Sequence, residues 1–355
     1  MLNAAWPVIR EDLSLSYAEI GVLLSVPFYV SAVVEPIFGV FGDTRLRRAV
    51  VLGGGCAFAL GLALAAAAPG FVLLLVALCA LSPASGAFVS LSQATLMDLD
   101  PQRRERSMAL WTLSGSVGVV AGPLAVAASI VLGGGWRAPL AALAIMALLL
   151  TVAARALPAP PRDGAPSFRA AARATVAALR RVAVVRWLVL LELSDLMLDV
   201  FGAFLALYLV DAADLSTAEA GLGFALWTGA GLVGDALLLV VLRHVSGLAY
   251  LRASALLVAF LFPAFLLVEP LWAKLPLLAL LGVLNSGWYA IPKARLYSEL
   301  PGQSGAALTL GTLTGLVGGT FPLALGLLAA AVGIGNALWV LLAAPLALLV
   351  GMPRR

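Results

Sequence analysis

The stretch Leu15-Ser16-Tyr17-Ala18-Glu19 returns two hundred residues later as Leu215-Ser216-Thr217-Ala218-Glu219. At the same offset, Thr112-Leu113-Ser114-Gly115 returns as Thr312-Leu313-Thr314-Gly315. Pro101 has its counterpart in Pro301. The matches keep their order along the chain, so they predict two halves built on one plan.

The chain is too apolar for a soluble domain. Hydrophobic residues make up 63% and charged residues 11%, with a mean hydropathy of +1.06, whereas a soluble domain carries about 25% charged residues. No charged residue occurs between Arg48 and Asp98, or between Glu299 and Arg354. Because a spanning helix needs about 20 apolar residues, each interval predicts two spans with a turn, at Pro69-Gly70 and at Gly333-Ile334-Gly335.

The same hydropathy argument, continued along the chain, predicts an all-α integral membrane protein with eleven spans. Two repeated halves of such helices, which hold a solute between them, are the architecture of a secondary transporter. The predicted spans are 18–41, 49–68, 71–97, 107–132, 138–156, 187–210, 218–242, 250–268, 274–292, 306–330 and 335–352.

Basic residues predict the orientation. If the loop at 43–48 is cytoplasmic, 19 of the 22 Lys and Arg residues fall inside, and only Arg10, Arg137 and Lys274 fall outside. The positive-inside rule therefore predicts a cytoplasmic C-terminus. The net charge of +4 follows from this distribution and indicates no nucleic-acid partner. High Ala, Leu, Arg and Gly usage favours a GC-rich bacterial genome, hence the inner (cytoplasmic) membrane.

The repeat also predicts that a first helix is missing. At the offset of 200, the span at 187–210 needs a partner that ends near residue 10, and only Ala4–Ile9 matches its tail. A start codon assigned too late is our preferred cause, and a genuine eleven-helix protein is the alternative. We expect an N-terminal bundle over 1–156 and a six-helix bundle over 187–355. Between them, residues 157–186 are expected to form a linker with a basic amphipathic helix on the anionic inner leaflet.

A loop signature follows the first full span. The run Gly39-Val40-Phe41-Gly42-Asp43-Thr44-Arg45-Leu46-Arg47-Arg48 resembles that of the major facilitator superfamily. In that family the aspartate faces the positive N-terminal end of a helix and the arginines pair with acids, which latches the two halves in one state of the transport cycle. The resemblance implies a latch made by Gly39, Asp43, Arg47 and Arg48. Two departures are Leu46, where a glycine is usual, and Arg243, which stands at the position equivalent to Asp43.

A second motif supports the resemblance. Gly118, Gly122 and Pro123 resemble the glycine–proline motif of the family's antiporters, in which proline bends the helix; plain helix packing through small residues is the alternative. The resemblance implies two six-helix bundles related by a parallel pseudo-twofold axis, a central cavity and alternating access. The span at 71–97 lacks the arginine of many drug–proton antiporters in the family, which weakens multidrug export in particular.

Five carboxylates lie well inside the predicted spans, and no Lys or Arg does. A charge at the helix centre costs about 2.5–3.5 kcal/mol, so such acids are expected in a wet cavity, in a pair or in protonated form. Glu35 and Asp235 are equivalent at the offset of 200. They are expected either to face helix N-termini and close the interface, which we prefer, or to carry protons. The others are Glu192, Asp195 and Asp199.

These three acids share one helix face, at spacings of three and four residues. Glu192 is expected near the cytoplasmic entrance, with Arg186 or the linker arginines as its partner. Asp199 lies about 12 residues into its span, roughly 18 Å, and so near the midplane. We expect Asp199 to couple transport to protons, with Asp195 as second choice and a buried hydrogen-bonded acid as the alternative.

Polar and aromatic residues near the depth of Asp199 are the candidates for the substrate path. For each aromatic residue, packing against lipid or the protein core is the alternative role. A cavity that contains acids and no bases favours a neutral or cationic, partly apolar small molecule as the substrate. The candidates are Tyr29, Ser85, Ser90, Phe204, Trp227, Asn285, Trp288 and Tyr289.

We therefore expect a monomeric secondary transporter that works by alternating access, with proton-coupled export preferred over uptake by symport or facilitation. A non-transporting receptor or scaffold is a remote alternative. An enzyme is not expected, because His244 is the single histidine and neither H-E-x-x-H nor G-x-S-x-G occurs. No cofactor is expected, nor a metal site, since Cys56 and Cys79 have no zinc-ligand spacing.

Overall fold

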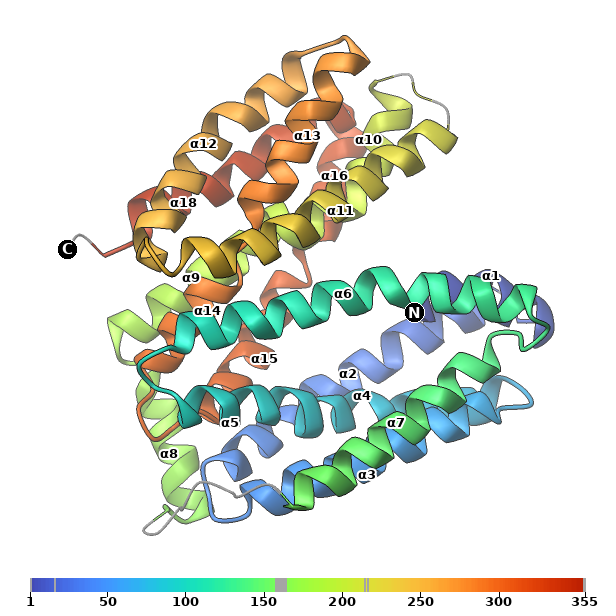
Figure 1. Ribbon diagram of the computed structural model, residues 1–355, viewed down its shortest axis with the longest axis vertical. Coiled ribbons are helices and arrows are strands. Elements are labelled where there is room, and N and C mark those ends of the chain that lie inside the picture. The colour runs from blue at the N-terminus through green and yellow to red at the C-terminus, as the bar shows by residue number, and fades with distance from the viewer. Residues whose placement is uncertain (1, 16, 157–164, 214, 216, 354–355) are drawn as a thin grey trace. The chain divides into compact units, whose positions relative to one another are not determined.

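The computed structural model describes residues 2–15, 17–156, 165–213, 215 and 217–353. Every regular element in these ranges is a helix, and they contain no strand (Figure 1). Eleven of the described helical stretches are long and apolar enough to cross a membrane, and they match the eleven predicted spans one for one. The prediction of an all-α membrane protein is confirmed. The stretches are Val22–Gly42, Arg47–Ala66, Phe71–Leu99, Arg104–Val131, Arg137–Ala156, Val182–Asp211, Glu219–Val241, Gly247–Leu267, Leu271–Ser298, Ala306–Val332 and Ile334–Gly351.

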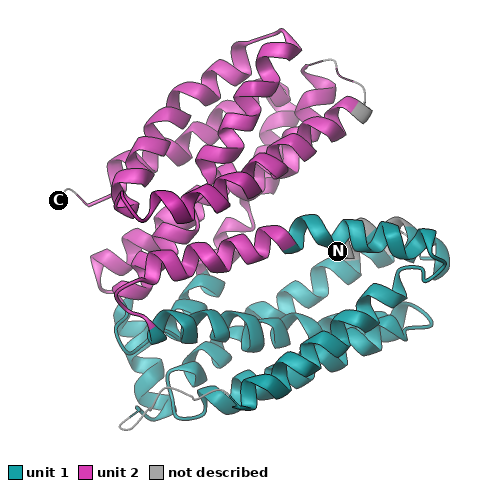
Figure 2. Ribbon diagram, in the orientation of Figure 1, with its two compact units in different colours: residues 1–99, 118–179, 300–313 teal, residues 100–117, 180–299, 314–355 magenta. Residues whose placement is uncertain are grey.

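The chain divides into two compact units, and neither is a continuous half of the chain (Figure 2). Unit 1 comprises 1–99, 118–179 and 300–313, and unit 2 comprises 100–117, 180–299 and 314–355. Each unit thus includes a segment from the opposite repeat. The predicted boundaries at 156 and 187 describe the repeats and stay a prediction.

Unit 1 is built from helices of the first repeat, the linker helix α8 and the beginning of one helix of the second repeat. Its elements are α1 (Leu2–Asp12), α2 (Tyr17–Gly42), α3 (Arg47–Ala66), α4 (Phe71–Ser85), the π-helix η1 (Gly86–Ser90), α5 (Leu91–Leu99), the later part of α6 (Arg104–Val131), α7 (Arg137–Ala156), α8 (Phe168–Ala178) and the first part of α15 (Ala306–Gly318).

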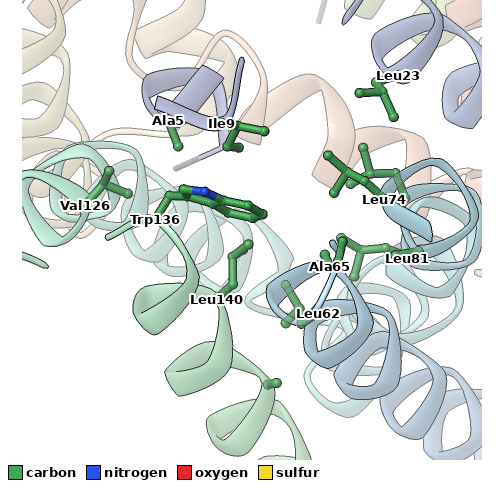
Figure 3. Close-up of a cluster of buried hydrophobic side chains, with 14 of the residues drawn as sticks. Ala5, Ile9, Leu23, Leu62, Ala65, Leu74, Leu81, Val126, Trp136 and Leu140 are labelled. Carbon is green, nitrogen blue, oxygen red and sulfur yellow. The ribbon is translucent and has the colours of Figure 1, made fainter. Parts of the chain in front are cut away.

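A cluster of buried hydrophobic side chains holds α1 against the rest of unit 1 (Figure 3). Ile9 and Trp136 are buried within it. The Trp136 indole N–H donates to Asp12 at 3.1 Å, and the Arg137 guanidinium also donates to Asp12. These hydrogen bonds, that from Arg137 first, hold the pKa of Asp12 below its usual value. The predicted helical tail at Ala4–Ile9 is therefore part of a helix packed into unit 1.

Unit 2 contains the first part of α6 and the remaining helices. Its other elements are α9 (Val182–Asp195), the π-helix η2 (Leu196–Val200), α10 (Phe201–Asp211), α11 (Thr217–Val241), α12 (Gly247–Leu267), α13 (Leu271–Asn285), α14 (Ala290–Ser298), the end of α15, α16 (Phe321–Val332), α17 (Ile334–Ala337), the 3-10 helix η3 (Leu338–Leu342) and α18 (Ala343–Gly351).

An aromatic cluster forms the core of unit 2. The ring of Phe201 is fully buried and meets Trp227, Phe262 and Phe265 edge-on, with centroids 5.5–5.9 Å apart. Beside it Lys274 is buried, and its ammonium donates to the Tyr208 hydroxyl at 2.7 Å. Edge-on rings add specific attraction to the area that they bury, so this cluster fixes the helices that carry it.

Three of the described spans contain a π-helix or an unwound segment near their middles, and a fourth, Ala306–Val332, breaks between α15 and α16. The span Phe71–Leu99 contains η1, the span Val182–Asp211 contains η2, and the span Leu271–Ser298 unwinds over 286–289, where Gly287 has φ +84°. The η1 segment and the unwound segment are equivalent at the offset of 200. Irregular backbone at membrane depth is tolerated only inside protein or along a wet cavity, and π-bulges are frequent at functional sites. These interruptions therefore mark the places to search for a site.

The glycine–proline motif lies in one continuous helix. Pro123 is inside α6, and a Cβ added to Gly118 would meet no neighbouring atom within 4 Å. The equivalent segment of the second repeat is interrupted instead, since α15 ends at Gly318 and α16 begins at Phe321.

Candidate functional site

The loop signature forms a buried polar contact within unit 1. Asp43 is 1% exposed, and its two carboxylate oxygens accept the backbone N–H groups of Gly305 at 2.7 Å and Ala306 at 2.9 Å. These N–H groups begin α15, where the first turn of a helix leaves its donors unpaired and carries a partial positive charge. The aspartate thus caps a helix from the other repeat.

Arg47 extends this contact. Its guanidinium lies 2.6 Å from Asp98 and 3.5 Å from Asp43, and it donates to the Ser304 hydroxyl at 2.5 Å. Gly39 allows the helices to approach, because a Cβ there would lie 2.7 Å from the Gly305 carbonyl oxygen. We call Gly39, Asp43, Arg47, Asp98, Ser304, Gly305 and Ala306 the first latch.

Arg48 does not join the first latch. Its guanidinium donates to the backbone carbonyl of Arg155 at 2.6 Å, at the end of α7. This corrects the sequence-based expectation for Arg48: the four latch candidates included one residue that ties two helices of unit 1 to each other.

Unit 2 contains a related contact with its charges rearranged. Arg243, at the position equivalent to Asp43, is exposed. The acid comes instead from Glu105 at the start of α6, which accepts the Gly247 N–H at 3.1 Å and lies 2.8 Å from the Arg295 guanidinium. A Cβ on Gly247 would lie 2.6 Å from the Glu105 carboxyl carbon. We call Glu105, Gly247 and Arg295 the second latch.

Glu35 binds a hydroxyl group in unit 1. The Thr312 side chain donates to its carboxylate at 3.0 Å, and Ser31, one turn earlier on α2, is also hydrogen-bonded to it. One turn away, Thr309 donates to the Pro36 carbonyl at 2.9 Å. The partner of Glu35 is thus a side chain within α15, not the N-terminus of a helix as expected from the sequence.

Asp235 repeats this arrangement in unit 2. The Ser116 hydroxyl on α6 donates to its carboxylate at 2.5 Å, and Ser286 is hydrogen-bonded to it from the unwound segment. Here too, the partners are hydroxyl groups and not a helix N-terminus. Both acids therefore bind the segment that their unit receives from the opposite repeat.

The remaining three acids lie along α9 and η2. Asp195 is within Coulombic range of Glu192 and Asp199, and of the Lys293 ammonium on α14. The Asp195 side chain is half-buried and that of Asp199 is exposed. We call Glu192, Asp195 and Asp199 the acid cluster.

Glu192 is bound differently from the expectation. Its carboxylate accepts a hydrogen bond from Thr314 and lies against Gly318, both on the helix α15, whereas the expected partners were Arg186 or the linker arginines. The Lys293 ammonium lies within Coulombic range of this carboxylate.

Lys293 corrects the expectation that the spans contain no base. Because the span Leu271–Ser298 unwinds at 286–289 and resumes in α14, it extends past the predicted end at 292. Lys293 lies over the rings of Tyr289 and Tyr297, at 5.9 Å and 6.0 Å from their centroids. The acid cluster therefore has a cation nearby.

The substrate-path candidates occupy different environments. Tyr29 is 64% exposed. Trp288 is fully buried and donates to Ser254 at 3.0 Å, which fits the packing alternative. Asn285 is buried, and its amide donates to the Met197 carbonyl of η2 at 3.2 Å. The ring of Trp227 packs on Phe201. Ser85, Ser90, Phe204 and Tyr289 are half-buried.

Other features of the described residues lie apart from the acids. An open groove of about 550 Å³ between α3 and α7 is lined by alanines, Gly134, Ile145 and Arg137. His244 is exposed. Within the described residues, no group of three or more His, Cys, Asp or Glu side chains is placed to hold a metal ion.

Within the described residues, eleven helices are long and apolar enough to cross a membrane, and an aspartate caps a helix from the other repeat; these features point to a class of membrane transporter. The family model of the Major Facilitator Superfamily matches residues 1–321, and the chain belongs to that family. It is a transporter and not an enzyme.

Solved structures share the fold. The transporter FucP in its outward conformation is 18% identical, with 98% of this chain and 92% of that chain covered and a TM-score of 0.81. A structure of the E. coli fucose–proton symporter FucP is 17% identical, with 98% and 93% covered and a TM-score of 0.81. The human organic anion transporter MFSD10 (TETRAN) is 24% identical, with 93% and 83% covered and a TM-score of 0.70. A comparison with curated proteins finds no match.

Proposed function

We propose that this transporter couples the movement of a small, partly apolar solute of neutral or positive charge to protons, and that it works as an exporter. The acid cluster carries the proposal. Asp195 is within Coulombic range of both Glu192 and Asp199, and carboxylates coupled in this way bind and release protons together. Intramembrane acids commonly mark proton relays in transporters. The site lies on a span whose helix is interrupted by η2, as expected for a residue group that borders a wet pathway.

The charge of the acid cluster supports the proposed class of solute. The cluster contains three carboxylates, and the Lys293 ammonium lies within Coulombic range of two of them, Glu192 and Asp195. The group is therefore negative when its carboxylates are ionised, which favours a cation or a neutral hydrogen-bonding solute over an anion. Asp199 is the first candidate for coupling because it lies in η2, near the middle of the span Val182–Asp211, and its side chain is not enclosed by the protein.

The orientation follows from the basic residues. We place the latches and the C-terminus on the cytoplasmic side of the inner membrane, since 19 of 22 Lys and Arg residues then lie inside. The first latch would close the cytoplasmic side, and its opening would release the pathway to the cytoplasm.

Proton flux tests the coupling. Everted vesicles without an imposed pH gradient are mixed with candidate solutes, and the pH of the medium is recorded. Proton–solute antiport acidifies the medium, whereas symport, the alternative function, makes it alkaline. Asp199→Asn is expected to abolish the proton signal, while Asp211→Asn, which removes an exposed acid from the same span, keeps it. Unchanged coupling in Asp199→Asn excludes this residue.

A further inference from the structure

Glu35 and Asp235 have equivalent neighbours of different size. Gly86 lies against the Glu35 carboxyl, and Ser286 is hydrogen-bonded to Asp235. Gly86 and Ser286 are themselves equivalent at the offset of 200. The longer acid thus faces a residue without a side chain, and the shorter acid faces a residue that fills the space with a hydroxyl group.

The distances explain why the longer acid lies beside a glycine and the shorter acid beside a serine. A Cβ added to Gly86 would lie 2.6 Å from both Cγ and Cδ of Glu35, closer than carbon atoms can approach. In unit 2 the acid is one methylene shorter, and the Ser286 hydroxyl lies within hydrogen-bond reach of Asp235 and 3.1 Å from the Gly231 carbonyl oxygen. Each acid is therefore positioned by the interrupted segment of a neighbouring span, η1 in unit 1 and 286–289 in unit 2.

Each acid then binds a hydroxyl group on the segment from the opposite repeat. These are Thr312 on α15, at 3.0 Å from Glu35, and Ser116 on α6, at 2.5 Å from Asp235. An apolar side chain would pack against these helices without the free-energy cost that an intramembrane charge carries. A carboxylate differs because it has lone pairs for several donors, and water can replace the hydroxyl donor when the helix withdraws.

We propose that Glu35 and Asp235 are a matched pair of positioning residues, each of which keeps its unit closed by binding the segment received from the opposite repeat through one hydroxyl group. The proposal rests on alternating access, but not on the assignment of the proton-coupling site. The acid and its small neighbour can be exchanged only together: Glu35 with Gly86 in unit 1, and Asp235 with Ser286 in unit 2.

Spin labels on the protein without solute measure how often α15 is held against α2 in unit 1. Cysteines replace the exposed residues Leu46 and Pro301 in a background with Cys56→Ser and Cys79→Ser, and the distance distribution gives the ratio of closed to open molecules. Thr312→Val, which removes only the hydroxyl donor, is expected to lower this ratio about fivefold, the effect of one hydrogen bond. Gly86→Ser is expected to lower it at least as much, because Glu35 is displaced.

A double variant that exchanges the acid and its small neighbour together is the deciding test of the proposal. Glu35→Asp combined with Gly86→Ser installs the arrangement of unit 2 and is expected to restore the ratio. Gly53→Ser is the matched control, since a Cβ at Gly53 meets no neighbouring atom within 4 Å. The proposal is overturned if the double variant remains as open as Gly86→Ser, or if Thr312→Val leaves the ratio unchanged.

A reciprocal exchange covers the case in which Gly86→Ser does not fold. Asp235→Glu combined with Ser286→Gly is followed with labels at the exposed residues Gln102 and His244 of unit 2, and is expected to remain closed, whereas Asp235→Glu alone opens. An open double variant contradicts the proposal. Proton flux of the unaltered protein is measured separately, so an absence of proton coupling would refute the proposed function while leaving this test intact.

Discussion

Replacement of Asp43 by Asn tests the first latch most directly. The two side chains have the same shape, but the amide keeps one oxygen and presents an NH2 group to the second backbone donor. Of the two N–H groups at the start of α15, Gly305 and Ala306, one therefore loses its acceptor. The side chain also loses the charge that faces the positive end of the helix.

The structure sets the size of the effect. A hydrogen bond to a charged group contributes about 1.5–3 kcal/mol, and a charge at a partly buried helix end contributes up to about 2 kcal/mol. These contributions overlap, and Arg47 keeps its partners Asp98 and Ser304. We expect a net loss of about 3 kcal/mol, roughly 150-fold in the ratio of latched to unlatched molecules.

The labels at Leu46 and Pro301 report on this latch as well, because they flank its two sides in the sequence. Asp43→Asn is expected to convert a mostly closed distribution into a mostly open one. Arg45→Gln is the matched control, since Arg45 is an exposed charge in the same loop. If Asp43→Asn changes the distribution no more than Arg45→Gln does, the helix-capping argument fails.

Three further predictions concern stability. Gly247→Ala is expected to push Glu105 out of the second latch and lower the unfolding temperature in detergent, whereas Gly229→Ala, with no neighbouring atom within 4 Å of the added Cβ, should not. Phe201→Ala removes a fully buried ring and should cost about 3–5 kcal/mol; a loss below about 1 kcal/mol, the size of a surface change, would contradict the aromatic core. Asp12 has a lowered pKa in the folded state, so its contribution is present above its ordinary pKa of about 3.9 and disappears as the pH falls through the folded value. Asp12→Asn should therefore remove a small part of the stability at neutral pH, and an equal difference from the unaltered protein at every pH would contradict the assignment.

Part of the site was predictable from the resemblance to the family. The run Gly39–Arg48 resembles the loop signature of the family, which implies an aspartate at a helix N-terminus, where a negative charge is stabilised. The partner could not be predicted, since Gly305 is 262 residues further along the chain. The second latch was missed for a related reason: the equivalent position holds Arg243, and Glu105 comes from a different helix.

The location of Lys293 shows where hydropathy fails. A prediction from apolar length ends the ninth span near 292, because Lys293 and Arg295 follow. The structure continues that span to Ser298 after an unwound segment. The buried faces of α14 provide the reason: Ile291, Ala294 and Leu296 are fully or almost fully buried while Lys293 lies over two tyrosine rings. Gly287, whose positive φ favours glycine, was the one signal in the sequence.

The sequence by itself determined the spans, the repeat and the family, because about 20 apolar residues in lipid have one way to satisfy their backbone. The tertiary structure alone decided which acids meet which donors. Thr312 and Ser116 are ordinary helix residues in the sequence, and they become the partners of Glu35 and Asp235 only because each unit receives a helix segment from the opposite repeat. The hydropathy of a helix depends on the sequence of that helix alone, whereas these hydrogen bonds depend on how helices from distant parts of the chain pack together.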